Sequence, residues 1–93
     1  MDSNQNAIVA ALKAAGCSVQ SLAMVGQGCP DLIVCRAGKM ALLELKAGRG
    51  KVNQAQYLWA LQWNGPVHYV RSVDEALDAM GIVQRKQTPC PQS

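Results

Sequence analysis

The chain has 93 residues, 49% of them apolar, and a net charge of +3, values that describe one globular domain with no room for a second core. No apolar run approaches the roughly 20 residues of a membrane span, and the N-terminus lacks the charged and apolar regions of a secretory signal, so we expect a soluble cytoplasmic protein with no membrane partner. The modest positive charge suits a polyanionic partner without requiring one.

The first third of the chain predicts a helix, a strand and a bend. Residues 4–15 place apolar side chains at helical spacing, and Gly16 provides a C-terminal stop. Residues 17–22 alternate apolar and polar side chains, as a half-buried strand does. The glycine-rich residues 25–28 then form a flexible bend that leads to the next strand.

Two segments in the middle of the chain, residues 32–35 and 40–45, are dense enough in apolar residues to be central strands. The intervening residues 36–39 suit a hairpin turn. Pro30 lacks a backbone N–H and belongs at the first position of a strand or at a sheet edge. This placement predicts that Asp31 lies at the mouth of a strand, where a side chain can face a cleft.

The last third of the chain predicts a helix, a strand, a second helix and a tail. The first helix begins after Asn53, which can cap it, and ends before Gly65. Residues 67–70 form a short strand, and Ser72 opens a capping box for the second helix. Residues 84–93 have no apolar pattern and are expected to be a disordered tail.

Two apolar surfaces are predicted on the helix that follows Asn53. Tyr57, Leu58 and Leu61 are expected to face the core, whereas Trp59 and Trp63 form a second surface. That tryptophan surface is a candidate interface with a second copy of the chain.

The four cysteines could form a disulfide framework, a zinc site or ordinary apolar packing. Their spacings contain no Cys-x-x-Cys pair, and the single histidine is far from them in the sequence. A free cysteine among apolar residues behaves as a small hydrophobic side chain. We therefore favour reduced core thiols over metal ligands for Cys17, Cys29, Cys35 and Cys90.

Asp31 and Glu44 are the only acidic residues between Ser3 and Val73. If the two apolar strands pair as a hairpin, residues near their outer ends lie opposite each other, close enough for both carboxylates to share a divalent cation. Glu44 and Lys46, two residues apart, point to the same face of a strand about 6.6 Å apart. The same three residues also suit an inert, solvated sheet face with a weak ion pair.

Pro30-Asp31 followed by Glu44-Leu45-Lys46 resembles the PD-(D/E)xK nuclease signature. The surrounding segments are more particular, and they resemble the stand-alone VRR-NUC branch found in phage and bacterial proteins. These segments are GCPDLIV, ALLELKAG, VNQAQYLWALQWNG and VHYVRSVDEAL.

The similarity covers residues 4–80, most of the chain. It implies an α/β, restriction-endonuclease-like core in the order α-β-β-β-α-β-α, with a mixed central sheet flanked by helices, within residues 1–83. It also implies a bacterial or phage-infected cell as the setting. Relatives often have an acidic residue in the first helix, where Asn4, Gln5 and Asn6 stand here, and this departure leaves the number of metal ions open.

The resemblance also implies roles for individual residues. Asp31 and Glu44 would hold the metal ion together with the backbone carbonyl of Leu45. Lys46 would position or activate the attacking water, or stabilise the developing oxyanion. Gln56 would face the site and hydrogen-bond it or a substrate phosphate. The all-oxygen ligand set favours Mg²⁺, with Mn²⁺ as a substitute.

The activity implied by the resemblance is structure-selective hydrolysis of phosphodiester bonds in branched DNA, such as four-way junctions, by a homodimer. Basic residues would bind the phosphates, which position a nucleic acid without reading its sequence. The candidates are Lys39, Arg49, Lys51 and Arg71. Two alternatives stay open, namely a catalytically silent nucleic-acid-binding module with the same fold and a plain oligomeric scaffold.

Overall fold

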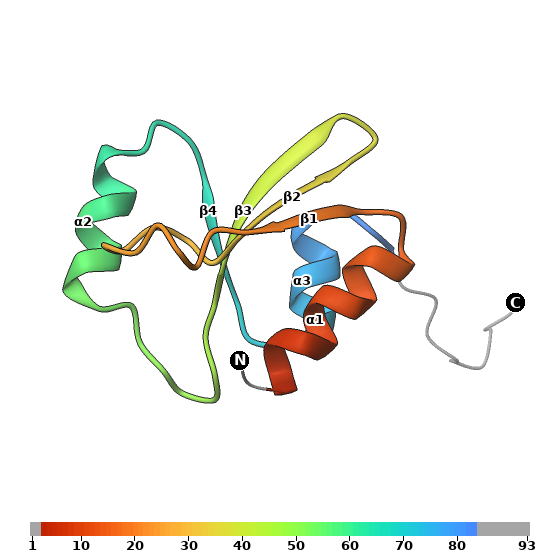
Figure 1. Ribbon diagram of the computed structural model, residues 1–93, viewed down its shortest axis with the longest axis horizontal. Coiled ribbons are helices and arrows are strands. Elements are labelled where there is room, and N and C mark those ends of the chain that lie inside the picture. Colours follow the sequence, from red (N-terminus) through yellow and green to blue (C-terminus); the bar gives the residue numbers. More distant parts are fainter. Residues whose placement is uncertain (1–2, 84–93) are drawn as a thin grey trace, which may run out of the picture.

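Two paired strands, β2 (Leu32–Arg36) and β3 (Lys39–Leu45), form the centre of the sheet in the computed structural model (Figure 1). They run antiparallel and are joined by a two-residue turn, in which Ala37 and Gly38 have φ values of 53° and 83°. Positive φ at both central residues is the type I′ geometry, whose twist matches that of the flanking strands. The predicted hairpin is confirmed.

The other two strands lie on either side of this hairpin. β1 (Ser18–Ser21) pairs antiparallel with β2, and β4 (Val67–Val70) pairs parallel with β3, so the strand order is β1-β2-β3-β4. A parallel pair requires a crossover connection, and α2 (Gln54–Gln62) lies within that crossover. With α1 (Ser3–Ala14) and α3 (Val73–Ala79), the chain forms a small α/β domain with a mixed four-stranded sheet and three helices.

α1 and α3 lie side by side and share one hydrophobic core with the sheet (Figure 1). Ile8 and Leu12, one turn apart on α1, are fully buried in this core, and burying such a side chain contributes about 1.5–3 kcal/mol. On β3, Leu43 is fully buried in the core and Leu45 packs against it. Because side chains alternate along a strand, Glu44 points to the opposite face.

The structure describes residues 3–83. The predicted tail, residues 84–93, and Cys90 lie outside this range. Cys17 is buried in the core, as predicted, and the other described cysteines are half-buried; all are free thiols. Within residues 3–83, no helix has the length and apolar character needed to cross a membrane.

The prediction that Tyr57, Leu58 and Leu61 face the core is wrong. Their side chains are 57%, 48% and 64% exposed, and α2 has no buried residue. Trp59 and Trp63 instead face the sheet and line a cavity beside it. The hydrophobic pattern alone therefore gave the wrong rotation for this helix.

A polar side chain sets the rotation of α2. Gln56 donates a hydrogen bond from Nε2 to Oε2 of Glu44 on β3 at 2.7 Å, which turns that side of the helix toward the sheet. Trp59, Ala60 and Trp63 follow Gln56 at three, four and seven residues, so they share its face. This contact turns Tyr57, Leu58 and Leu61 away from the sheet, whereas Trp63, at the C-terminal cap, lines the cavity although it is still 48% exposed.

Candidate active site

The carboxylates of Asp31 and Glu44 meet at the outer end of the β2–β3 hairpin. The register pairs Leu32 with Leu43, so the next residues outward lie opposite each other. The side chains of Asp31 and Glu44 share a hydrogen bond, and the backbone N–H of Leu45 donates to Asp31 Oδ2 at 2.8 Å. The two predicted acidic residues are therefore close together, and the Asp31 side chain is hydrogen-bonded to the backbone of β3.

Glu44 is buried, with only 4% of its surface exposed. Burial, followed by the charge of Asp31 and the hydrogen bond with it, raises the pKa of Glu44 to about 7, against the opposing effect of the Lys46 ammonium. Two adjacent carboxylates do not both ionise readily unless positive charge compensates them. Near neutral pH the pair therefore retains a proton that a divalent cation can replace.

Gln56 connects the acidic pair to the neighbouring lysine. Lys46 Nζ donates to Gln56 Oε1 at 2.8 Å, and Gln56 Nε2 donates to Glu44 Oε2 at 2.7 Å. Glu44 and Lys46 thus point to the same face of the sheet, as predicted from their spacing. The amide bridges a carboxylate and an ammonium and fixes their relative positions.

The N-terminal cap of α2 belongs to the same network. Asn53 Oδ1 accepts a hydrogen bond from the backbone N–H of Gln56 at 2.9 Å, and Gln56 Oε1 accepts one from the backbone N–H of Asn53 at 3.1 Å. This is a capping box with glutamine at its third position. Gln56 Oε1 also accepts the hydrogen bond from Lys46 Nζ. The same side chain therefore fixes both the start of α2 and the position of Lys46.

Gly28 lets the loop before β2 approach the backbone of α2, a role that reasoning from the sequence missed. Gly28 has a φ of 86°, and a Cβ added there would overlap the carbonyl of Ala55 and come within 2.9 Å of the Gln56 nitrogen. Only glycine tolerates both the conformation and the contact. The approach joins the segment carrying Asp31 to the helix carrying Gln56. A glycine three residues before Asp31 was the available signal.

Cys29 is a second residue whose place near the site was missed. It is half-buried, and its thiol pKa is raised by burial and then by the charges of Glu44 and Asp31. The thiol therefore lies within the electrostatic field of the acidic pair. Its spacing of two residues from Asp31 is the signal that could have identified it, because alternate residues of an extended chain share a side.

Two of the predicted phosphate-binding residues lie in the loop that leads from β3 to α2. Arg49 and Lys51 are exposed there. Arg71, which follows β4, donates from Nη1 to the backbone carbonyl of Gly48 at 2.9 Å. Arg71 thus anchors the loop that carries the other two residues.

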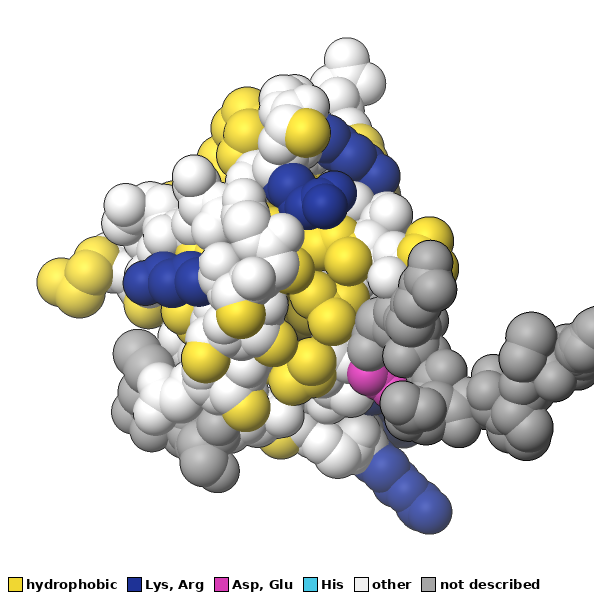
Figure 2. Space-filling model, turned by 90° about the vertical axis from the view of Figure 1, so that its right-hand side faces the viewer, with side chains coloured by type: hydrophobic (Ala, Val, Ile, Leu, Met, Phe, Trp, Pro, Cys, Tyr) yellow, Lys and Arg dark blue, Asp and Glu magenta, His cyan; other side chains and the backbone are white. Residues whose placement is uncertain are grey.

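Lys39 is far from the acidic pair. It begins β3, five residues before Glu44, a distance of about 17 Å at roughly 3.4 Å per residue. On the side of the molecule shown in Figure 2, the Lys and Arg side chains of the described residues lie in separate places, with apolar side chains exposed between them. This side does not present one continuous basic surface.

The chemistry of the donor set fits a hard divalent cation. Within residues 3–83, no group of three or more His, Cys, Asp or Glu side chains could hold a metal, so the side-chain donors are the two carboxylates. Mg²⁺ is commonly bound through one or two carboxylates and keeps several waters. The pair of Asp31 and Glu44, completed by a backbone oxygen and waters, matches that requirement.

We expect Gln56→Ala to destabilise the protein and to raise the pKa of Glu44 further. The substitution removes the hydrogen bond that the backbone N–H of Asn53 donates to Gln56 Oε1, worth about 0.5–1.5 kcal/mol, and the donor that favours the ionised carboxylate. Urea denaturation and the NMR titration of the Glu44 carboxyl carbon would measure the two effects. Gln54→Ala, at the exposed first position of α2, is the matched control, and equal effects of both substitutions would contradict the bridging role.

The chain matches no model of a protein family, and searches of curated proteins and of solved structures also give no match. The function of the site therefore has to be inferred from its residues and their geometry.

Proposed function

We propose that this protein is a metal-dependent endonuclease of the PD-(D/E)xK superfamily, of the VRR-NUC type, that hydrolyses phosphodiester bonds in branched DNA. The observation that supports it best is the single network that joins Asp31, Glu44, Gln56 and Lys46. The element order α-β-β-β-α-β-α around a mixed sheet also suits a restriction-endonuclease-like core.

In this proposal Asp31, Glu44 and the backbone carbonyl of Leu45 hold the metal ion, which is Mg²⁺ by preference with Mn²⁺ as a substitute. When bound, such an ion neutralises charge on the phosphate oxygens and lowers the pKa of a bound water. Because binding of the ion would displace the proton that Glu44 carries near neutral pH, affinity for the ion is expected to increase with pH through the Glu44 pKa of about 7 and to level off above it.

Lys46 supplies positive charge on the same face as Glu44. An ammonium has three N–H donors, and the contact with Gln56 uses one of them. The others can orient a water or a phosphate oxygen, and the charge stabilises the negative charge that develops during hydrolysis. Arg49 and Lys51 extend this positive region along the loop that Arg71 anchors.

A cleavage assay tests the proposal. A labelled four-way junction and a linear duplex are incubated with the protein in Mg²⁺, in Mn²⁺ and in chelator. We expect the protein to cut DNA only when a metal ion is present and to prefer the junction to the duplex. Cutting should be lost in Asp31→Ala, Glu44→Ala and Lys46→Ala. Lys13→Ala, an exposed lysine in the last turn of α1, is the control for Lys46→Ala and should cut normally.

Each other outcome has a defined meaning. A mobility shift of the junction without cutting in either metal would make the protein a silent nucleic-acid-binding module. Neither a shift nor cutting would make it a scaffold. Cutting that persists in chelator, or in all three site variants, would rule out the metal-dependent site.

We also propose that two copies associate through the outward face of α2, in place of the surface of Trp59 and Trp63 suggested by the sequence, because those two side chains line a cavity. Tyr57, Leu58 and Leu61 expose apolar side chains on that helix, and a chain of this size gains stability when such surface is covered. A two-fold dimer would present two sites for two symmetric cuts.

Replacing Leu61 by lysine is expected to convert the dimer to a monomer. A charge at the centre of an apolar interface loses its solvation without gaining a partner, and we expect the dissociation constant to rise by at least about tenfold, the change that corresponds to roughly 1.4 kcal/mol. Sedimentation equilibrium measures it. Val25→Lys, at an exposed apolar residue of the loop before β2, is the control; a wild-type monomer at high concentration would contradict the interface.

A further inference from the structure

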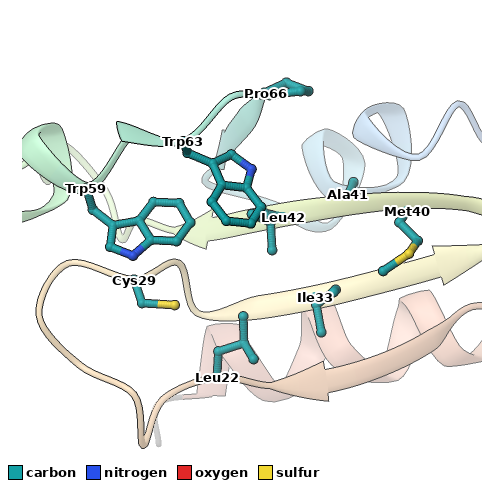
Figure 3. A pocket seen from close by; sticks show the side chains of 9 residues that line it. All are labelled: Leu22, Cys29, Ile33, Met40, Ala41, Leu42, Trp59, Trp63 and Pro66. Atoms are coloured by element: carbon teal, nitrogen blue, oxygen red, sulfur yellow. The ribbon is translucent and has the colours of Figure 1, made fainter. Parts of the chain in front are cut away.

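A cavity of about 430 Å³ lies on the face of the sheet that α2 covers (Figure 3). The cavity lies between the apolar side chains of the sheet and the two tryptophans at the C-terminal end of α2. Trp59 and Trp63 are stacked, with ring centroids 4.8 Å apart and an angle of 22° between the planes. The opposite wall includes Leu22, Cys29, Ile33 and Leu42.

Three elements contribute residues both to this cavity and to the acidic site. On the loop before β2, Cys29 lines the cavity and Asp31 lies in the site. On β3, Leu42 and Glu44 share a face and are about 7 Å apart along the strand.

On α2, Trp59 lies one turn after Gln56, on the same side of the helix. The cavity and the acidic pair are therefore neighbouring parts of one surface. A ligand with a charged group at the carboxylate site can place an attached apolar ring in the cavity.

We propose that this cavity holds an unpaired nucleobase of the DNA strand whose phosphate lies beside Lys46, at the metal site that Asp31 and Glu44 would form. The inference rests on the proposed nuclease function and extends it to the choice of substrate. Nucleobases are planar rings that bind to proteins by stacking on aromatic and apolar side chains. The volume lies within the range of known small-molecule sites, and the tryptophans provide aromatic surface that does not depend on base identity.

A nucleobase in this cavity would produce a preference for branched or single-stranded DNA. A base inside a duplex must first leave its stack, which costs a few kcal/mol, whereas a base at a junction or in a single strand is already free to enter. The cavity would thus select for DNA structure without reading base sequence.

Tryptophan fluorescence tests the inference directly, because both tryptophans of the chain line the cavity. The protein is titrated with an eight-residue oligothymidylate and with an oligonucleotide of the same length and charge whose sugars lack bases. Ca²⁺ is present, and a denaturing gel verifies that the oligonucleotides remain intact. We expect oligothymidylate to quench the emission and to bind roughly 5- to 150-fold more tightly, the range that stacking of one base supplies.

Ile33→Phe narrows the cavity from the wall opposite the tryptophans and leaves the fluorophores in place. We expect it to abolish the difference between the two oligonucleotides without changing the affinity for the abasic one. Met24→Phe adds a ring of the same size at a side chain that is 98% exposed, outside both the cavity and the proposed dimer interface, and should leave the difference intact.

Equal affinities for the two oligonucleotides, or a difference that survives Ile33→Phe, would overturn the inference. So would an emission change that follows protein concentration without DNA, since it would assign the cavity to a second copy of the chain. The cleavage assay separates the two claims. Metal-dependent cutting with equal affinity for the two oligonucleotides contradicts only the proposal that the cavity holds a nucleobase. Tighter binding of oligothymidylate without any cutting contradicts only the proposed nuclease function.

Discussion

Glu44→Gln is expected to abolish cleavage and, in metal-free protein at pH 8, to raise the melting temperature. The substitution removes a carboxylate that would hold the metal, and loss of several kcal/mol of transition-state stabilisation corresponds to a fall in rate of about 10³-fold or more. The amide keeps an oxygen that can accept the hydrogen bond from Gln56 and gains an N–H that can donate to Asp31. The active site is thus expected to gain stability as it loses activity.

The sign of the stability change follows from the pKa of Glu44, which is about 7 in the folded protein against an ordinary value of 4.5. Between pH 4.5 and about pH 7 the folded protein binds a proton that the unfolded chain has lost. The free energy of unfolding therefore decreases as pH rises through this range. The decrease is complete above pH 7. Glutamine has no charge to lose, so the variant avoids the decrease at pH 8 and should equal the wild type more closely at pH 4.5.

Thermal denaturation at several pH values, with and without Mg²⁺, measures this effect. A change of about 1 kcal/mol shifts the melting temperature of a domain of this size by roughly 4–8 °C. Asp78→Asn, at an exposed residue of α3, is the control and should show no such pH dependence. If Glu44→Gln melts below the wild type at pH 8, the buried carboxylate is not the destabilising group inferred here.

Gly28→Ala is expected to destabilise the protein by about 2–5 kcal/mol and to remove cleavage. About 1–2 kcal/mol arises because a side chain is strained at a φ of 86°, and overpacking against the Ala55 carbonyl adds about 1–3 kcal/mol. The helix can relieve the overlap by moving away from the sheet. That movement would withdraw Gln56 from Glu44 and Lys46.

Gly26→Ala is a closely matched control. Gly26 has a φ of 70° and nothing within 4 Å of an added Cβ, so the substitution retains the backbone strain of about 1–2 kcal/mol and omits the overlap. The difference between the two variants in urea denaturation isolates the contact with α2. Equal destabilisation by both, with cleavage preserved in Gly28→Ala, would show that this contact does not position the site.

Local features of the sequence were sufficient to predict the helices and strands and to predict which side chains share one face of the site. Two apolar segments separated by a short turn that contains Gly38 indicate the hairpin, and the hairpin register determines that Asp31 lies opposite Glu44. The period of two along β3 places Glu44 and Lys46 on one face and Leu43 in the core. These predictions succeeded because each depends on neighbours in the chain.

The rotation of α2 could be decided only by the tertiary structure. Its apolar residues fit two faces about equally well, and a local pattern cannot choose between them. The choice depends on the hydrogen bonds that join Gln56 to Glu44 of β3 and to Lys46 just after it and on a backbone contact at Gly28. The sequence by itself determined which residues could act together, whereas the packing of distant segments decided that Gln56 bridges Glu44 and Lys46 and that the tryptophans enclose a cavity beside them.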